Sequence, residues 1–392
     1  MKWWFGRKAG RVGARPFLFR AWAAAPAAGD WPRGYESQVR EAYLGNPVAQ
    51  RAVRLVAESV AWCPLYALGE EAPRPRPRDR GRGKGPSPAG AAAGLATPAL
   101  LDAAASQLLL HGNAYLQILT GPDGRPSELF ALRPERVKVE AGPSGWPAAY
   151  VYKAGEARTR LPARDALGRP CLVHIKALHP LDDHYGLGCL GAAAGAVAIH
   201  NQATRWNKAL LDNAARPSGA LVFDARDGGA LPADQFERLK AEMEAEFAGA
   251  ANAGRPMLLE GGLKWQAMSL SPADMDFVGL KAAAAREIAL AFGVPPMLLG
   301  LPGDATYANY REANRALWRL TVLPLAERIL AAVSAALGAW WPGIRLKVDI
   351  DQISALAEDR ERLWAQVTAA DFLSRAEKRD MLGFDADEGG EK

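Results

Sequence analysis

Zinc-compatible side chains crowd one stretch between positions 171 and 189. They are cysteines, histidines and aspartates, side-chain types that bind Zn²⁺ in proteins: Cys171, His174, His179, Asp182, Asp183, His184 and Cys189. Around a metal ion, such groups could activate a water molecule for hydrolysis. However, the stretch contains neither a Cys-x-x-Cys pair nor a helical His-x-x-x-His pair. We therefore expect a structural role and no bound metal, with a metal-dependent hydrolase centred on His174–His184 as the alternative.

No second catalytic pattern stands out elsewhere in the sequence. The segment 81–85 contains Lys84, but it has neither the following Ser or Thr nor the preceding strand of a phosphate-binding loop. Two pairs of carboxylates suit helix caps and solvated surfaces better than a two-metal site: Asp274 with Asp276, and Asp349 with Asp351. The residue types therefore predict a protein that is not an enzyme and needs no cofactor.

Composition favours a large protein of a reducing compartment. The chain has 392 residues, of which 49% are hydrophobic, enough for two or more substructures. Its three cysteines are scattered and odd in number, which argues against a disulfide scaffold. Four tryptophans near the start could anchor subunits: Trp3, Trp4, Trp22 and Trp31. Four others are expected in the core: Trp62, Trp206, Trp318 and Trp364.

Positive charge is concentrated in two segments of the chain. The net charge is +5, and basic residues dominate an N-terminal arm, 1–30, and a Pro/Gly-rich loop, 71–91. Proline and glycine at such density prevent regular structure, so the loop is expected to be solvated. These segments keep a basic DNA-binding protein open as a second alternative.

Periodicity along the chain predicts an α+β protein. The spacing of apolar residues predicts helices over 47–62, 98–110 and 189–215. Short strands bounded by turn residues are expected at 65–68, 114–118, 137–140 and 150–153. No apolar run is expected to be long enough to cross a membrane.

A compact αβ insert is expected from 217 to 272. It would contain strands at 220–223, 256–260 and 263–268, and a helix with an acidic outer face near 232–247. Ser271 and Asp274 have the spacing of a capping box, which predicts a helix that starts there and ends at Gly293.

A Gly/Pro-rich loop, 297–307, follows that helix in the sequence. Neither flanking helix can continue through it, because it carries Gly300, Pro302 and Gly303. Another long helix is expected from about Tyr307 to Leu337, followed by short helices with acidic N-terminal caps.

Several short strings occur in one order between Asn46 and Pro324. They include Asn46-Pro47-Val48, Leu108 to Gln117, Leu132 to Val137, Val173 to Gly188, Pro217-Ser218-Gly219 and Leu258-Leu259-Glu260. Downstream they continue with Arg286, Ile288, Phe292 to Pro296, Leu299-Gly300, Tyr307, Asn309, Thr321 and Pro324. In this order the strings resemble the portal proteins of tailed bacteriophages, in the branch typified by phage HK97. A phage, a prophage and a gene transfer agent all remain open as the source.

The resemblance implies a portal fold with a wing, stem helices, an αβ clip, a tunnel loop and a short helical crown, assembled as a ring. The implied parts are the basic arm (1–30), the first part of the wing (31–188), a stem helix (189–216), the clip (217–272), a second stem helix (273–294), the tunnel loop (295–307), a wing helix (308–348) and the crown (349–392). About twelve copies would close into the ring.

The resemblance also implies a function, which is a DNA channel at one capsid vertex. DNA would enter through it during packaging and later leave through it. The implied partners are double-stranded DNA, the terminase large subunit, a head-completion adaptor and the major capsid protein, with assembly in the bacterial cytoplasm into a virion or phage-like particle. The implied channel residues are Lys281, Arg286, Pro302, Gly303, Asp304, Thr306 and Tyr307, and the implied clip docking residues are Glu237, Glu244 and Arg255.

Overall fold

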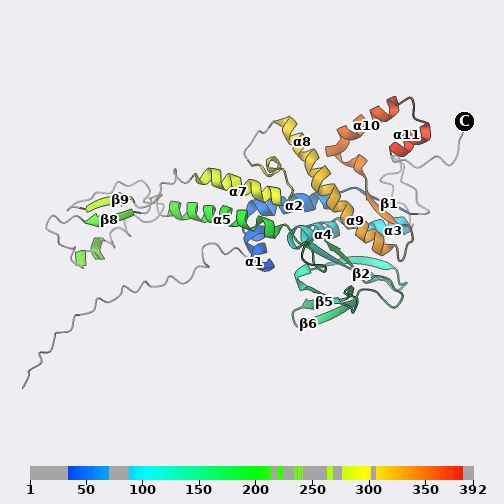
Figure 1. Ribbon diagram of the computed structural model, residues 1–392, viewed down its shortest axis with the longest axis horizontal. Coiled ribbons are helices and arrows are strands. Elements are labelled where there is room, and N and C mark those ends of the chain that lie inside the picture. The colour runs from blue at the N-terminus through cyan, green and yellow to red at the C-terminus, as the bar shows by residue number, and fades with distance from the viewer. Residues whose placement is uncertain are drawn as a thin grey trace, which may run out of the picture. The chain divides into compact units, whose positions relative to one another are not determined.

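The computed structural model describes residues 34–69, 88–212, 219–223, 263–267, 276–301 and 306–382, together with 234–235, 237–239 and 241. Helices and antiparallel strands are mixed along these ranges (Figure 1), so the predicted α+β class is confirmed. The N-terminal arm and the strand expected at 256–260 lie outside the described residues. The basic loop was predicted to reach residue 91, but α3 (Pro88–Leu95) already begins at Pro88, since proline suits the first turn of a helix.

Helices form the larger core. After α1 (Tyr35–Val39) and η1 (Arg40–Leu44), helix α2 (Pro47–Ala61) packs against α4 (Pro98–His111), α7 (Phe277–Ala291) and α9 (Leu323–Leu337). The buried residues of α2 recur every three or four positions, which places them on one face of the helix: Ala49, Ala52, Val53, Val56, Ala57 and Val60. Apolar periodicity therefore positions α2, as the sequence predicted.

Local signals set the ends of α2 and α4. The Oδ1 atom of Asn46 accepts hydrogen bonds from the backbone N–H groups of Val48 and Ala49, both at 3.0 Å. Gly112 ends α4 in the left-handed conformation with φ of 81°, which glycine adopts at little cost. Both helices therefore lie where they were predicted.

Two three-stranded antiparallel sheets enclose a smaller core. One has the order β3 (Pro126–Leu132), β2 (Asn113–Thr120), β7 (Leu172–Lys176), and the other the order β4 (Val137–Ala141), β5 (Pro147–Ala154), β6 (Ala157–Pro162), with η2 (Pro134–Arg136) between β3 and β4. Their shared core consists of Tyr115, Leu132, Val137, Val139, Tyr150 and Leu172. The expected strands are confirmed, whereas β3, β6 and β7 were not predicted. A separate pair joins β1 (Leu65–Leu68) to β10 (Arg345–Val348).

Helices α5 (Leu190–Asp212) and α7 lie side by side (Figure 1). The rings of Trp206 and Phe277 stack with centroids 4.2 Å apart. The predicted start of the second helix is wrong, because Asp276 is its N-cap and accepts a hydrogen bond from the backbone N–H of Gly279 at 3.1 Å. Strands β8 (Gly219–Phe223) and β9 (Leu263–Ala267) form an antiparallel pair, in agreement with two of the strands expected for the insert.

One helical stretch runs from Tyr307 to Leu337, through α8 (Tyr307–Leu317), a π-helical turn, η5 (Trp318–Val322), and α9. Pro324 lacks a backbone N–H, and the π turn immediately before it absorbs the break in the hydrogen-bond ladder. Among the described residues, this stretch alone is long and apolar enough to cross a membrane by length and composition, with a mean hydropathy of 1.7 over 18 residues. The expectation that no run reaches that length is therefore wrong. Several of its apolar side chains belong to the helical core, including Val322, Ile329 and Val333.

Short helices follow β10. They are η6 (Ile350–Gln352), η7 (Ser354–Leu356), α10 (Ala357–Ala369) and α11 (Arg375–Met381). The acidic N-terminal cap expected in this region is found at α11, where Ser374 and Glu377 exchange the two hydrogen bonds of a capping box, at 2.8 and 3.2 Å. Asp349 is not solvated as expected. It is buried, its N–H donates to the carbonyl of Pro64 at 2.7 Å, and its Oδ2 accepts from Gln352 Nε2 at 2.7 Å.

Candidate functional site

The zinc-compatible stretch extends along β7 and the loop that follows it to the start of α5. His174, on β7, lies in the small core, stacked on Tyr115 at 4.3 Å and edge-on to Tyr150 at 5.8 Å. Burial lowers the pKa of His174 to about 4, which keeps the imidazole neutral at neutral pH. Its Nε2 lies 3.0 Å from Asn113 Oδ1, an acceptor, so Nε2 carries the proton.

Most other members of that stretch lie in the loop between β7 and α5, whereas Cys171 directly precedes β7. Asp182 Oδ1 accepts from the backbone N–H groups of His184 and Tyr185, at 2.7 and 2.9 Å. Burial raises the pKa of the Cys171 and Cys189 thiols, which disfavours the thiolate form that binds metals. Within the described ranges, no three Cys, His, Asp or Glu side chains converge as a metal site would require. His174 and Asp182 thus have structural roles in this fold.

Asn113 is the centre of what we call the Asn113 junction, which ties this loop to the end of α4. Its side chain is fully buried, accepts from the Gly186 N–H at 2.7 Å and donates to the Gly186 carbonyl at 3.1 Å. Gly112, Gly186 and Gly188 allow the two backbones to touch, since a Cβ on Gly186 would overlap the carbonyl oxygen of Gly112. The junction fixes the entry into α5.

The two basic residues predicted for the channel lie on different sides of α7. They are five residues apart, which separates them by about 140° around a helix. Lys281 is half-buried and lies near His200 on α5. The pKa of His200 is lowered, mainly by burial and in addition by the positive charge of Lys281. Arg286 is exposed, beside Glu287. The structure therefore does not bring these two cations together.

The loop residues predicted for the channel are only partly described. Thr306 does not extend the loop, because it is the N-cap of α8 and its Oγ1 accepts from the Asn309 N–H at 3.2 Å. Tyr307 begins α8, as predicted, and is 81% exposed. The 3₁₀ turn η4 (Pro296–Leu299) ends at Gly300, whose φ is 73°. Pro302, Gly303 and Asp304 lie outside the described residues.

The clip docking residues are the least described of the predicted sites. Glu237 is exposed in a short helical piece, in agreement with the expected acidic outer face. Glu244 and Arg255 lie outside the described residues. Docking at these positions stays a prediction.

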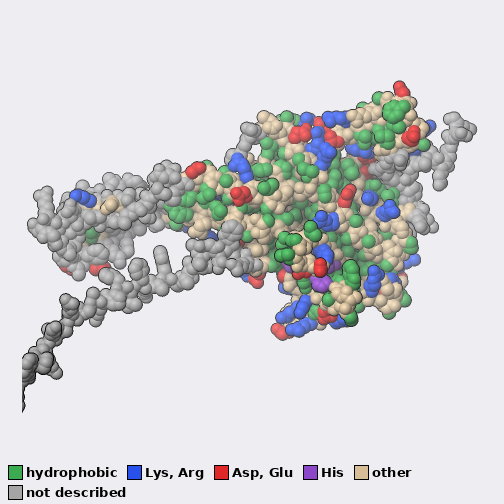
Figure 2. All heavy atoms as spheres, in the orientation of Figure 1, with side chains coloured by type: hydrophobic (Ala, Val, Ile, Leu, Met, Phe, Trp, Pro, Cys, Tyr) green, Lys and Arg blue, Asp and Glu red, His purple; other side chains and the backbone are tan. Residues whose placement is uncertain are grey.

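A network of ion pairs between α8 and α10 was not predicted. Arg315 bonds Glu358 at 2.7 Å and Glu312 at 2.9 Å, and only 12% of its side chain is exposed. Arg311 also bonds Glu358, at 2.5 Å, and Asp359 lies 3.6 Å from Arg315 and 3.8 Å from Arg319. We call this set the Arg315 seam, and Figure 2 shows basic and acidic side chains interleaved where α8 faces α10. The four-residue spacing of its arginines places them on one helix face, but their shared partner Glu358 lies 47 positions from Arg311 and 43 from Arg315.

A polar contact between α2 and α5 was also missed. Asn46 Nδ2 donates to Asn201 Oδ1 at 2.8 Å and lies 3.1 Å from His200 Nδ1, and all three residues are buried. Asn201 in turn donates to the backbone carbonyl of Glu41 at 2.8 Å. This network holds α5 against the start of α2.

The sequence and the fold match a known family. The family described as Phage portal protein matches residues 47–383, which is most of the chain. The chain therefore belongs to the phage portal protein family, whose members are structural proteins and not enzymes. A crystal structure of an HK97 family portal protein from Corynebacterium diphtheriae shares the fold at 17% identity, with a TM-score of 0.52 over 80% of this chain and 97% of that one.

Relatives with higher sequence identity include a protein of a gene transfer agent particle. A chain in the neck of a native gene transfer agent (GTA) particle, computed with C12 symmetry, is 49% identical over 91% of this chain and 95% of that one, with a TM-score of 0.65. An uncharacterized protein of Rickettsia felis is 41% identical over 88% of both chains. A probable portal protein of Streptomyces phage phiC31 is 26% identical over 80% of this chain and 69% of that one. The predicted family and fold are thus confirmed.

Proposed function

We propose that this chain is one subunit of the ring-shaped DNA channel at a single vertex of a capsid, in a gene transfer agent or a related phage particle. The terminase would package DNA through the ring, DNA would later leave through it, and a head-completion adaptor would attach to it. One observation carries the proposal, which is the 49% identity to a chain in a particle neck computed with C12 symmetry. Closure into a ring needs head-to-tail contacts built into the shape of each subunit.

We further assign the parts of the subunit by the resemblance. Helices α5 and α7 would form the stem, the segment 217–272 the clip, and the segment 295–307 the tunnel loop. The helical core and the two sheets would form the wing, and α10 and α11 would belong to the crown. The antiparallel pairing of β8 with β9, two strands that lie between the stem helices in the sequence, fits an αβ clip.

DNA must slide through such a channel, so its contacts with phosphate have to be few or balanced. Each ion pair with a phosphate adds salt-dependent affinity and would slow transit. Arg286, exposed beside Glu287, fits this role better than Lys281, which is half-buried against α5. Tyr307 at the exposed start of α8 and Asp304 in the preceding loop are further candidates for the channel wall.

The mass of the purified full-length protein tests the ring. About twelve chains of 42.0 kDa should give a particle on the order of 500 kDa with a central hole in electron micrographs. A monomer at every concentration would contradict the proposal and favour a basic DNA-binding protein.

A loop deletion tests the channel. Removing Pro302 to Asp304 should leave ring formation intact, because the loop lies between two helices and would project into the lumen, but should reduce the DNA content of particles. Particles with unchanged DNA content would place this loop away from the channel.

A further inference from the structure

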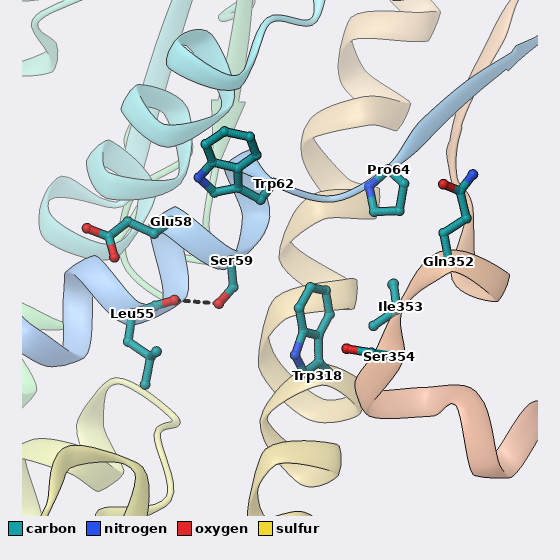
Figure 3. Close-up of a pocket in the computed structure, with 9 residues that line it drawn as sticks. All are labelled: Leu55, Glu58, Ser59, Trp62, Pro64, Trp318, Gln352, Ile353 and Ser354. Carbon is teal, nitrogen blue, oxygen red and sulfur yellow. Dashed lines mark hydrogen bonds between the residues drawn. The ribbon is translucent and has the colours of Figure 1, made fainter. Parts of the chain in front are cut away.

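A groove with two tryptophans opens at the C-terminal end of α2 (Figure 3). It holds about 360 Å³ and is lined by α2, the helix through Trp318 and the turns before α10. Trp62 was predicted in the core but is 78% exposed, because it is the C-cap residue of α2. The one charged residue in the lining, Glu58, is already bound by Arg54 at 2.6 Å, so charge selects no ligand for this groove.

The outer face of the β4–β5–β6 sheet, by contrast, carries a surplus of positive charge. The segment 133–169, which contains this sheet, has eight Lys or Arg residues and four Asp or Glu residues, whereas the whole chain has a net charge of only +5. Figure 2 shows basic side chains clustered over β6. This is a third concentration of positive charge, besides the N-terminal arm and the Pro/Gly-rich loop, and it was not predicted.

Strand register places the basic side chains on one side of the sheet. Lys138, Val151 and Arg160 form one row across the three strands. Lys153 and Arg158 lie directly opposite each other in the next row on the same face. Because successive residues of a strand point to opposite faces, the four cations share the face away from the small core, and all four are exposed.

Most of these cations have no acidic partner. The acids on or beside this face are Glu140, which bonds Arg160 at 2.7 Å, and Glu156 on the turn between β5 and β6. Among the described residues, no carboxylate pairs with the other three cations, which are Lys138, Lys153 and Arg158. The face therefore keeps unneutralised positive charge.

The position of Lys153 opposite Arg158 is unfavourable in the protein alone. Like charges at directly opposed positions of two antiparallel strands destabilise a sheet, whereas opposite charges stabilise it. An anion bound at both side chains would offset this repulsion. The like-charge pair is thus a second observation, besides the surplus of charge, that indicates an anionic ligand.

The remaining side chains of the face indicate the kind of anion. Apart from Glu140 and the four cations, the described residues on this face are small or aliphatic: Ala149, Val151 and Pro162. They offer no aromatic ring for stacking on a base and no amide for reading a base edge. Cations on strands about 5 Å apart fit an extended array of phosphates, and duplex DNA carries one phosphate per about 1.7 Å of its axis.

We propose that the outer face of the β4–β5–β6 sheet binds the phosphate backbone of double-stranded DNA without reading its sequence, an inference that rests on the function proposed above for the presence of DNA. Contacts with phosphate position DNA but carry no sequence information. Because each such contact would slow DNA in transit, this face suits DNA at rest and not the wall of the channel.

Binding of a fluorescently labelled duplex to the full-length protein tests this face. The probe has about 30 base pairs of mixed sequence, and anisotropy gives its affinity at salt concentrations between about 50 and 200 mM. The triple variant Lys138→Gln, Lys153→Gln and Arg158→Gln should bind the duplex about tenfold more weakly, or weaker still. The slope of log affinity against log salt should become shallower by about 3, roughly one for each lost phosphate contact.

A second triple variant removes the same charge elsewhere. Arg328→Gln, Arg362→Gln and Arg375→Gln replace three exposed cations, on α9, α10 and α11. Its affinity for the duplex and its salt slope should stay close to those of the unmodified protein. Equal losses in the two triple variants would show that net charge alone attracts DNA, and would overturn the proposal.

The single variant Lys153→Glu separates binding from folding. It places a carboxylate opposite Arg158, so the melting temperature should rise while the affinity for the duplex falls. A lower melting temperature with unchanged affinity would show that Lys153 serves the fold, and would overturn its role in binding.

The mass of each protein, measured on the same samples, keeps this proposal apart from the proposed channel. Rings of normal mass in which both triple variants bind the duplex as tightly as the unmodified protein would overturn the DNA-binding face and leave the channel in place. If such rings also entered fewer particles when they carried the sheet variant, the partner of this face would be an acidic protein surface. A loss of affinity confined to the sheet variant, in a protein that forms no ring, would support the face and overturn the channel.

Discussion

The Asn113 junction and the Arg315 seam both join segments that are distant in sequence, but by opposite chemistry. The junction is neutral and tightly packed, with a buried amide and glycines whose backbones touch. The seam consists of ion pairs whose acidic members, Glu358 and Asp359, remain partly exposed. A dry packed contact has one arrangement, whereas partly solvated ion pairs are screened by salt and can exchange partners. We infer that the start of α5 is held in one arrangement, whereas α10 can shift relative to α8.

Gly186→Ala should have the largest effect on the junction. The added methyl group would overlap the Gly112 carbonyl, and neither backbone can move without breaking the bonds to Asn113. We expect the free energy of unfolding to fall by about 3 kcal/mol or more, measured by urea denaturation. Gly191→Ala is the matched control, because nothing lies within 4 Å of its new Cβ, and it should be neutral or gain about 0.5 kcal/mol. Equal stability of both variants would contradict the tight junction.

The pH dependence of stability tests the burial of His174, which hydrogen-bonds to Asn113 at the junction. Burial lowers the pKa of His174 to about 4, whereas an unfolded histidine titrates near 6.5. Between these values the unfolded chain binds more protons, so stability is complete above about pH 6.5 and is lost as the pH falls towards 4, by at most about 1.4 kcal/mol per pH unit. His174→Gln should flatten this part of the curve of unfolding free energy against pH. The same slope in both proteins would show that other groups cause it.

The Arg315 seam should give the smallest effect, and a local one. Arg315→Gln removes the cation shared by Glu312, Glu358 and Asp359, so α10 should pack less firmly while the helical core stays intact. We expect faster hydrogen exchange over 357–369, and raised salt should reproduce part of that change in the unmodified protein. Arg328→Gln, on the exposed side of α9, is the control. A fall in the global free energy of unfolding of Arg315→Gln would show that the seam stabilises the whole helical core and not α10 alone.

Local sequence signals predicted many elements but few of the contacts between them. The predicted bounds of α2 and α4 are close to the observed ones, and Asn46, Thr97 and Gly112 cap these helices through neighbours within a few residues. The start of α7 at Asp276 was missed, since Ser271 and Asp274 offered an equally good local cap. The channel and clip assignments remain predictions, and they came from the family resemblance rather than from any local pattern.

The sequence by itself determined the α+β class, the family and the order of the long helices, because periodicity, caps and short strings are properties of neighbouring residues. Only the tertiary structure decided that Asn113 would hold Gly186, that Arg315 would meet Glu358, and that Trp62 would be exposed. Those outcomes depend on which strands pair and which helices touch across forty or more residues. The free energy of such contacts depends on burial and distance in the folded chain, which spacing along the sequence does not encode.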